Sequence, residues 1–290
     1  MLNGILIINK SKGYTSHDVV AKVKKILNVK KVGHTGTLDP NATGVLPLLL
    51  NDGTKLSKYL IEHDKEYIVT LKLGIRTDTL DSEGKILEER KVDSLVLEDT
   101  EKILNSFIGK QEQLPPMYSA IKVNGKKLYE YARNGEEVEL KPRKIEIYNI
   151  ELIKIDKDKN EIEFKVDCSK GTYIRSLCVD IANKLGTIGY MKELNRTKVG
   201  IFEISDAITI DELENNKQLA NNKLIEMEDL LKSKPKIILE DKNLKQFLNG
   251  VKITTNENED IYKIYKEDGE FLGTGLIKEN RLKRDIIITK

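Results

Sequence analysis

Apolar residues recur along the chain with both the helix period and the strand period. A continuous apolar run at residues 5–8 predicts a short buried strand. Thr15 and Asp18 have the spacing of a helix-capping box, and the apolar residues after them recur on one face of a helix. Apolar and polar residues then alternate over residues 67–73, which predicts a strand that ends at Gly74. The beginning of the chain therefore contains both kinds of element.

The middle of the chain continues this mixture. Residues 97–108 predict a helix that ends before Gly109, and residues 145–155 and 162–166 predict two strands joined by a polar turn. Strand and helix runs do not alternate strictly, so we expect an α+β fold, with helices packed on a mixed or antiparallel sheet. The sequence shows no repeat of 20–50 residues, which argues against a solenoid.

A second, smaller domain is predicted toward the C-terminus. The polar segment around Pro235 separates the two, so we expect one domain over residues 1–232 and another over residues 233–290. Residues 244–248 predict a short amphipathic helix that ends at Gly250. Three strand-like runs separated by turn residues follow this helix: residues 262–265, 271–277 and 286–288.

Composition limits the classes of function without selecting one. The formal net charge of the 290-residue chain is +2, so any nucleic-acid site must be a local basic face. Cys168 and Cys178 have no metal-ligand spacing with the three histidines, and we expect neither a metal site nor a disulfide framework. The sequence has no cationic leader and no segment long enough to span a bilayer, so we expect a cytoplasmic protein without a membrane partner.

Asp39 occupies the tip of a glycine-rich loop with no second acid beside it. Residues 33–46 read GHTGTLDPNATGVL, and Pro40 pushes the preceding residue toward an extended or turn conformation. The glycines permit tight bends, so the loop presents the carboxylate instead of placing it inside an element. An isolated Asp-Pro pair would be an ordinary turn or helix cap. The complete run closely resembles the catalytic loop of the tRNA pseudouridine-55 synthases, the TruB family.

Other motifs resembling this family follow in the family's order. Residues 4–10 and 13–16 resemble its opening strand and loop, although Ser11 stands where the family usually has proline. The downstream matches are residues 64–67 (DKEY), 76–79 (RTDT), 116–120 (PMYSA), 127–133 (KLYEYAR), 168–175 (CSKGTYIR) and 194–197 (LNRT). The resemblance implies the pseudouridine synthase fold, an RNA-binding insertion over about residues 116–143, and a PUA-like RNA-binding domain over residues 233–290.

The resemblance also implies a reaction. Its members are isomerases (intramolecular transferases) that convert uridine to pseudouridine at position 55 in the T-loop of tRNA. This reaction breaks a C–N glycosidic bond and forms a C–C bond at the same ribose carbon, without redox change or hydrolysis, so no cofactor is expected. A carboxylate can form the covalent intermediate, and the resemblance assigns this role to Asp39. Whether Asp39 attacks the ribose or the base stays open.

Arg175 and Tyr67 are the other predicted catalytic residues. Arg175 falls in the first turn of a predicted helix, where a cation opposes the helix dipole. It could bridge to an acid such as Asp180 or serve a pocket, and the resemblance favours pairing with Asp39. Tyr67 by itself is typical of a half-buried strand residue. The resemblance implies that its ring stacks on the target base and its hydroxyl takes part in proton transfer.

Four further residues are predicted to bind the substrate. His34 by itself could be a general base, a loop histidine or an RNA contact; the resemblance implies that it supports the RNA loop after the uridine has flipped out. Tyr173 could be a core residue or an aromatic wall of the pocket, and Leu194 matches a pocket-lining leucine of the family. Lys10 belongs to the basic residues that lie where an RNA backbone could run.

Two other functions fit parts of the sequence. An RNA-folding protein could retain the pocket without using it, although intact Asp39, Tyr67 and Arg175 argue against an idle enzyme. A glycoside hydrolase would need a second carboxyl group, and none stands out in the sequence. We therefore predict an enzyme whose partner is the T-arm stem-loop of tRNA and which acts as a monomer.

Overall fold

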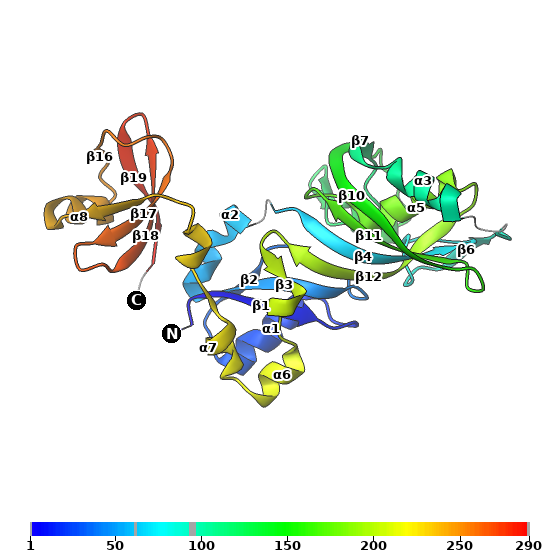
Figure 1. Ribbon diagram of the computed structural model, residues 1–290, viewed down its shortest axis with the longest axis horizontal. Coiled ribbons are helices and arrows are strands. Elements are labelled where there is room, and N and C mark those ends of the chain that lie inside the picture. The colour runs from blue at the N-terminus through cyan, green and yellow to red at the C-terminus, as the bar shows by residue number, and fades with distance from the viewer. Residues whose placement is uncertain (1, 61–62, 93–96, 289–290) are drawn as a thin grey trace.

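A ten-stranded sheet forms the centre of the larger part of the molecule (Figure 1). The structure is a computed structural model that describes residues 2–60, 63–92 and 97–288. In spatial order the main strands are β14 (Ile225–Glu226), β1 (Gly4–Lys10), β3 (Thr43–Leu50), β12 (Gly189–Val199), β4 (Lys65–Leu73), β11 (Glu161–Cys168), β10 (Arg143–Asp156) and β7 (Gly109–Gln113). Two short strands lie off this path: β2 (Val32–His34) pairs with β3, and β13 (Phe202–Glu203) pairs with β12.

The pairing of strands confirms the predicted α+β class. Strands β3 and β12 run parallel, and the other paired strands of this sheet are antiparallel. The strand predicted over residues 67–73 is β4, whose Tyr67, Val69, Leu71 and Leu73 are buried. Alternate residues of a strand point to opposite faces, so this pattern places one face of β4 in the core.

Three helices pack their apolar sides against the sheet. They are α1 (Ser16–Leu27), α3 (Leu97–Asn105) and α5 (Ile174–Lys184), and each contributes buried residues to the main hydrophobic core. Helix α1 begins at the predicted capping box: Asp18 N donates to Thr15 Oγ1 at 3.1 Å, and Thr15 N donates to Asp18 Oδ2 at 2.8 Å. The cap satisfies amides that have no partner inside the helix.

The helix predicted over residues 97–108 ends earlier than expected. Helix α3 ends at Asn105, and the amides of Phe107 and Ile108 donate to carbonyls three residues back. The chain therefore tightens into turns before β7 begins at Gly109, whose φ of 111° favours glycine. The apolar residues after the helix continued its periodicity but belong to this turn.

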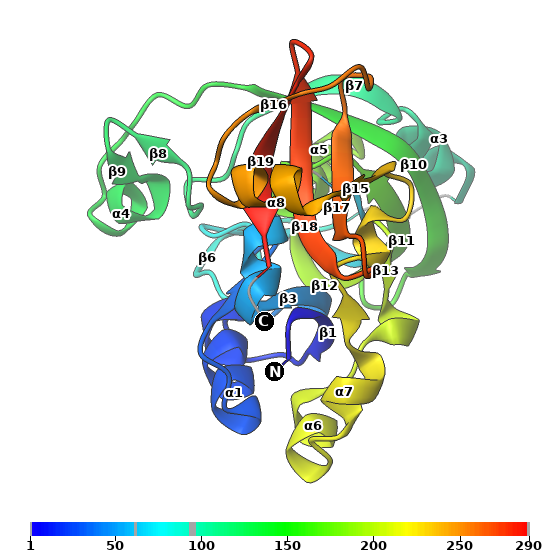
Figure 2. The same ribbon diagram turned by 90° about the vertical axis from the view of Figure 1, so that its left-hand side faces the viewer.

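The remaining described elements of the larger part are short. They are α2 (Ser57–Leu60), β5 (Ile75–Thr77), β6 (Ile86–Glu89), α6 (Ile210–Asn215), α7 (Leu219–Lys223) and the 3₁₀ turns Asn51–Leu56, Ile204–Asp206 and Asp229–Leu231. Within the predicted insertion, β8 (Lys122–Val123) and β9 (Lys126–Lys127) form a small hairpin followed by α4 (Leu128–Arg133). This unit projects from the side of the molecule in Figure 2. No helix within the described part of the chain is long and apolar enough to cross a membrane.

The C-terminal segment forms a separate five-stranded sheet. Its strands are, in spatial order, β15 (Lys236–Leu239), β17 (Ile261–Lys266), β18 (Phe271–Lys278), β19 (Arg281–Ile287) and β16 (Ile253–Thr254). Helix α8 (Asp241–Leu248) supplies Phe247 to a small core between helix and sheet. Strand β19 begins five positions before the predicted residue 286, because its early residues are mostly charged and only Leu282 among them is buried.

This C-terminal sheet rests against the larger part of the molecule. Asp285 of β19 accepts hydrogen bonds from Lys58 Nζ and Tyr59 Oη on α2 and, at 2.9 Å, from Thr274 Oγ1 on β18. Ile286 packs into an apolar cluster with residues of β1 and β3. The two parts are therefore joined by a partly buried polar network as well as by the chain.

Candidate active site

A cavity of about 490 Å³ lies beside β4 and β12, at the N-terminal end of α5. Five residues of the predicted site line it: Asp39, Tyr67, Tyr173, Arg175 and Leu194. The remaining lining residues are Thr37, Leu38, Tyr118, Ser119, Ala120, Tyr129, Thr172, Ile174 and Met191. The fold thus brings the loop before β3, two strands of the sheet and the predicted insertion to one pocket.

Backbone and side-chain contacts fix the loop that presents Asp39. Ser16 Oγ of α1 accepts from Leu38 N at 2.9 Å and donates to Leu38 O at 3.3 Å. Ala42 N donates to Asp39 O at 3.1 Å, which closes a turn around Pro40. The loop ends at Gly44 with φ of 104°, where an added Cβ would lie 2.2 Å from Arg196 O. Only glycine fits this close approach to β12.

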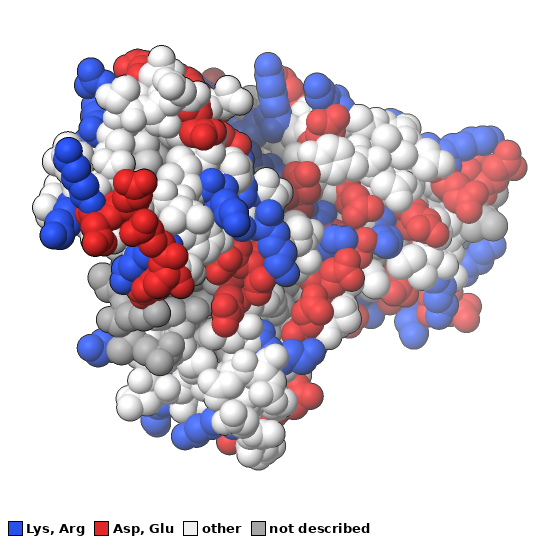
Figure 3. Space-filling view, turned by 60° about the vertical axis from the view of Figure 1, so that its left-hand side comes forward, with Lys and Arg blue, Asp and Glu red and all other residues white. Residues whose placement is uncertain are grey.

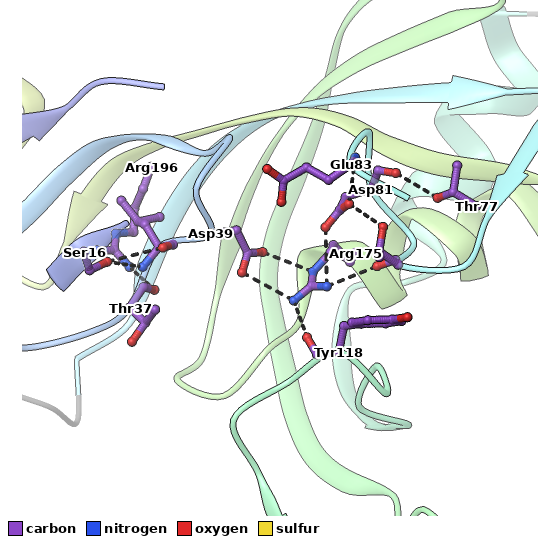
Figure 4. A network of polar contacts seen from close by, with 11 residues as sticks. Ser16, Thr37, Asp39, Thr77, Asp81, Glu83, Tyr118, Arg175 and Arg196 are labelled. Atoms are coloured by element: carbon purple, nitrogen blue, oxygen red, sulfur yellow. Dashed lines mark hydrogen bonds and ion pairs between the residues drawn. The ribbon is translucent and has the colours of Figure 1, made fainter. Parts of the chain in front are cut away.

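Arg175 pairs with Asp39 as predicted. The Nε atom of Arg175 lies 3.1 Å from Asp39 Oδ2, and its Nη2 lies 3.4 Å from Oδ1 (Figure 4). The arginine side chain is 8% exposed and that of Asp39 is 36% exposed. The carboxylate therefore faces the cavity while its cationic partner stays behind it. The alternative, a bridge from Arg175 to Asp180, is not formed.

Asp81 is a second acidic partner of Arg175, which the sequence did not predict. Its Oδ2 lies 3.4 Å from Arg175 Nη1, and its side chain is buried. The turn that carries it is held by Thr77 Oγ1, which donates to Asp81 O at 2.8 Å, and by Glu83 N, which donates to Asp81 Oδ1 at 3.0 Å. In Figure 4 the guanidinium lies between the two carboxylates. The Asp39 loop itself contains no second acid, but the fold brings Asp81 from a distant segment of the sequence to the same arginine.

The surroundings of Arg175 explain a cation at the N-terminal end of α5. Besides the two carboxylates, Nη1 donates to Thr79 O at 3.1 Å and Nη2 donates to Tyr118 O at 2.9 Å. Four acceptors thus compensate the unfavourable position against the helix dipole. Tyr118 belongs to the predicted insertion, so the same guanidinium also ties this segment to the pocket.

Burial governs the charge of Asp39. Desolvation raises the pKa of the Asp39 carboxyl and is the largest influence on it. The cations of Arg175 and Lys10 lower this pKa, and the negative charge of Asp81 raises it. The net shift is upward. Burial likewise raises the pKa of Glu83, with additional contributions from Asp81 and Asp39. Burial and neighbouring negative charge therefore shift both Asp39 and Glu83 toward the neutral form.

Tyr67 forms the floor of the cavity on β4. Burial raises the pKa of its hydroxyl to about 12, and the nearby Arg196 guanidinium opposes this increase. The phenol is consequently protonated near neutral pH. Arg196 is itself buried and donates to backbone carbonyls of the Asp39 loop. Arg196 lies within the family-like motif at residues 194–197, but no separate role was predicted for it.

Comparison with known proteins agrees with this geometry. The model of the TruB family pseudouridylate synthase N-terminal domain matches residues 24–174. Models described as the tRNA pseudouridylate synthase B C-terminal domain and as the pseudouridine synthase II TruB C-terminal region match residues 175–251 and 235–284. A tRNA pseudouridine synthase B of Clostridium tetani is 45% identical over 280 residues, which cover 94% of this chain and 95% of the relative. The chain belongs to the TruB family.

Other relatives and a solved structure extend this result. A tRNA pseudouridine synthase B of Alkaliphilus oremlandii is 48% identical over 285 residues, which cover 96% of this chain and 94% of the relative. A chain in the crystal structure of a Cbf5-Nop10-Gar1 complex matches with a TM-score of 0.70 at 25% identity, covering 100% of this chain and 84% of that one. The TruB-family chain is thus an isomerase with the pseudouridine synthase fold.

The substrate residues predicted for the TruB-family chain differ in placement. Tyr173 and Leu194 line the cavity, whereas His34 and Lys10 do not. The His34 ring lies edge-on to His17 with centroids 5.5 Å apart, and its Nδ1 has no partner within the described structure. Burial lowers the pKa of His34, and electrostatic interactions with His17 and Arg196 lower it further. His34 therefore favours the neutral form.

Lys10 lies behind the Asp39 loop and bonds to its backbone. Its side chain is buried, and Nζ donates to Tyr14 O at 2.6 Å, Pro40 O at 2.9 Å and Ser11 O at 3.1 Å. These bonds use all three donors of an ammonium group. Burial lowers the pKa of Lys10 to about 8, and the nearby Asp39 carboxylate opposes this shift. The conformation therefore leaves no donor for RNA and favours support of the Asp39 loop over the predicted substrate contact.

No metal centre accompanies these residues in the part of the chain that the structure describes. Among residues 2–60, 63–92 and 97–288, no group of three or more His, Cys, Asp or Glu side chains could hold an ion. Both cysteines are buried free thiols. The side chains that line the pocket include the Asp39 carboxylate, the Arg175 guanidinium and tyrosine phenols.

Proposed function

We propose that the chain isomerises uridine to pseudouridine at position 55 in the T-loop of tRNA, with Asp39 as the nucleophile. The observation that carries this proposal is the Asp39 carboxylate, which faces a cavity of about 490 Å³ and is held from behind by Arg175. Relatives of nearly full length that are named tRNA pseudouridine synthase B support tRNA as the substrate. No cofactor is required, because the product has the same composition and oxidation state as the substrate.

The charge of Asp39 is central to the proposed chemistry. Attack at the ribose carbon and addition to the base both need an ionised carboxylate. Burial alone would favour the neutral acid, and Arg175 opposes it with a buried positive charge at 3.1 Å. The guanidinium also holds the carboxylate in a fixed orientation, so that the attacking oxygen is positioned before the substrate arrives.

Tyr67 and the cavity walls would hold the target base. The ring of Tyr67 lies on the cavity floor and offers a stacking surface, while its protonated hydroxyl can donate a proton to the ribose or base. Tyr173 and Leu194 provide aromatic and aliphatic walls. Such a closed pocket keeps the detached uracil beside the ribose carbon until the C–C bond forms. A T-loop uridine must flip out of its stack to enter this pocket.

The insertion over residues 116–143 supports binding of folded RNA at the mouth of the cavity. Tyr129 lines the cavity, and Arg133 and Lys127 each lie 5.3 Å from its ring centroid. Lys126 lies 4.4 Å from the ring centroid of Tyr131. Cations beside aromatic rings suit phosphate contact and base stacking. On the face shown in Figure 3, acidic and basic side chains are interspersed, which agrees with a net charge of only +2. We further propose that residues 233–290 form the PUA-like domain and contribute to RNA binding.

Pseudouridine formation in unmodified tRNA tests the proposal. The wild-type chain and Asp39→Asn are incubated with tRNA in the presence of a chelator, and modification of the T-loop uridine is mapped by position. We expect product at position 55 from the wild type and none from Asp39→Asn, with tRNA binding retained in both. Binding and refolding of tRNA without product in the wild type would contradict the proposal and favour an RNA-folding protein.

A further inference from the structure

Arg196 occupies the position in the sheet between the two catalytic segments. Strand β12 lies between β3 and β4, and in this register Arg196 is opposite Gly44 on one side and opposite Tyr67 on the other. Gly44 ends the loop that carries Asp39. One residue of β12 therefore adjoins both the end of the nucleophile loop and the tyrosine of the cavity floor.

The side chain of Arg196 reaches both ends of the Asp39 loop. Its Nε donates to Val45 O at 2.8 Å, Nη2 donates to Gly36 O at 3.1 Å, and Nη1 lies 3.4 Å from Thr37 O. Figure 4 shows Arg196 beside Thr37, on the far side of Asp39 from Arg175. The planar guanidinium is suited to this arrangement because its donors point in several fixed directions.

These bonds cross a sparsely paired seam of the sheet. The parallel ladder between β12 and β3 pairs only Asn195 with Thr43 and Arg196 with Gly44. Neighbouring ladders, such as the one between β1 and β3, pair seven positions. The arginine side chain therefore supplies hydrogen bonds between the loop and β12 where the backbone supplies few.

The charge of Arg196 has no acidic partner. Within the residues that the structure describes, no carboxylate forms an ion pair with it, although its side chain is only 2% exposed. Burying a cation without a counterion is unfavourable, and an apolar residue would fill the space at lower cost. The phenol of Tyr67 is one of the ionisable groups near Arg196, and the positive charge would stabilise any negative charge that develops on the phenol oxygen.

We propose that Arg196 is a positioning residue for the isomerisation, which fixes the Asp39 loop relative to Tyr67. The inference rests on the proposed function, because Arg196 acts through these two residues and does not line the cavity. Loss of the guanidinium's hydrogen bonds would let the Asp39 loop shift relative to Tyr67. A misplacement of about 1 Å can lower a rate about 100-fold without loss of binding.

Two substitutions separate the geometry of Arg196 from its charge. Arg196→Lys keeps the positive charge but cannot bond three carbonyls in the same directions, and Arg196→Gln removes the charge. Asn51→Gly is the matched control, because it also removes three side-chain bonds to backbone groups, at Leu2, Lys30 and Lys31. Asn51 has φ of 48°, which glycine adopts without strain. The control therefore measures the effect of comparable destabilisation at the far end of β3.

The test measures the single-turnover rate, the Kd for tRNA and the unfolding midpoint for each variant, alone and combined with Tyr67→Phe. We expect Arg196→Lys and Arg196→Gln to lower the rate about 100-fold with the Kd unchanged. We expect Asn51→Gly to lower only the unfolding midpoint. We also expect the Arg196 effect to shrink in the Tyr67→Phe background, since residues that act together are not additive.

Three results would overturn the inference. One is a wild-type rate for Arg196→Lys and Arg196→Gln. Another is a rate loss in the Arg196 variants that is the same with and without Tyr67→Phe and that Asn51→Gly also produces. The last is failure of both Arg196 variants to fold, which would make the residue part of the fold alone. Absence of product from the wild type, in contrast, would count against the proposed function.

Discussion

The two buried arginines beside the cavity have opposite surroundings. Arg175 lies between two carboxylates, Asp39 and Asp81, whereas Arg196 donates to three backbone carbonyls. Arg175 lines the cavity and contacts the Asp39 carboxylate directly, and Arg196 bonds to the loop that carries Asp39. The comparison shows one side-chain type used in two ways: to balance charge in one region and to set geometry in the other.

The difference follows from where each arginine lies in the fold. Arg175 stands at the N-terminal end of α5, where the helix dipole is unfavourable and acidic partners are required. Arg196 stands inside the sheet, beside a parallel ladder of two residue pairs, and its donors reach carbonyls of Val45 and of the Asp39 loop. Substitutions at the two positions should therefore change different properties of Asp39.

The largest effect in this comparison is expected at Arg175. Arg175→Ala removes the buried cation that lowers the pKa of Asp39, so the neutral form of Asp39 is favoured. We expect a decrease in the single-turnover rate of about 100- to 1,000-fold, the range seen for loss of one electrostatic group in an active site. Circular dichroism and tRNA binding serve as controls. A rate near that of the wild type would remove Arg175 from catalysis.

A smaller effect is expected from Asp81→Asn. The substitution removes a negative charge that raises the pKa of Asp39, but it also removes a contact that orients Arg175. We expect about a tenfold lower rate at neutral pH, which corresponds to about 1.4 kcal/mol in the barrier. Rates equal to the wild type would show that Asp81 does not orient the arginine.

The pH dependence of Asp81→Asn separates these two contributions. Asp39 must be ionised to act, and its pKa is raised in the folded protein, so the rate should fall as the pH drops through a value above 3.8. Removal of the neighbouring negative charge lowers the pKa of Asp39, so the acidic side of the pH–rate profile should move to lower pH. A move of this side to higher pH would contradict the assigned electrostatics.

The sequence predicted those helices and strands whose signal lies entirely within their own residues. The alternation over residues 67–73 corresponds to β4, and the Thr15–Asp18 capping box starts α1. The end of α3 and the start of β19 were missed, because apolar periodicity continued into a turn in one case and charged residues covered a strand in the other. Strand pairings between distant segments were not predictable from periodicity.

The contacts of the site also include some that the sequence predicted and some that it did not. Resemblance in the motifs predicted the pairing of Arg175 with Asp39, which the structure contains. Asp81 was missed because its contact with Arg175 spans distant segments, and no local pattern marks a buried acid in a turn. The charge of Lys10 suggested a contact with RNA, whereas its bonds to the carbonyls of Tyr14 and Pro40 had no local signal in the sequence. Contacts made across the fold were therefore the part that sequence reasoning lacked.

The pKa of Asp39 in the two arginine variants is the most direct test of this division of roles. Aspartate labelled with ¹³C at the carboxyl group, with the Asp39 signal assigned from Asp39→Asn, allows titration by NMR in the wild type, Arg175→Gln and Arg196→Gln. We predict a higher pKa in Arg175→Gln and an unchanged pKa in Arg196→Gln, with the isomerisation rate lowered in both. An equal upward shift in both variants, or none in Arg175→Gln, would contradict the assignment of charge to one arginine and geometry to the other.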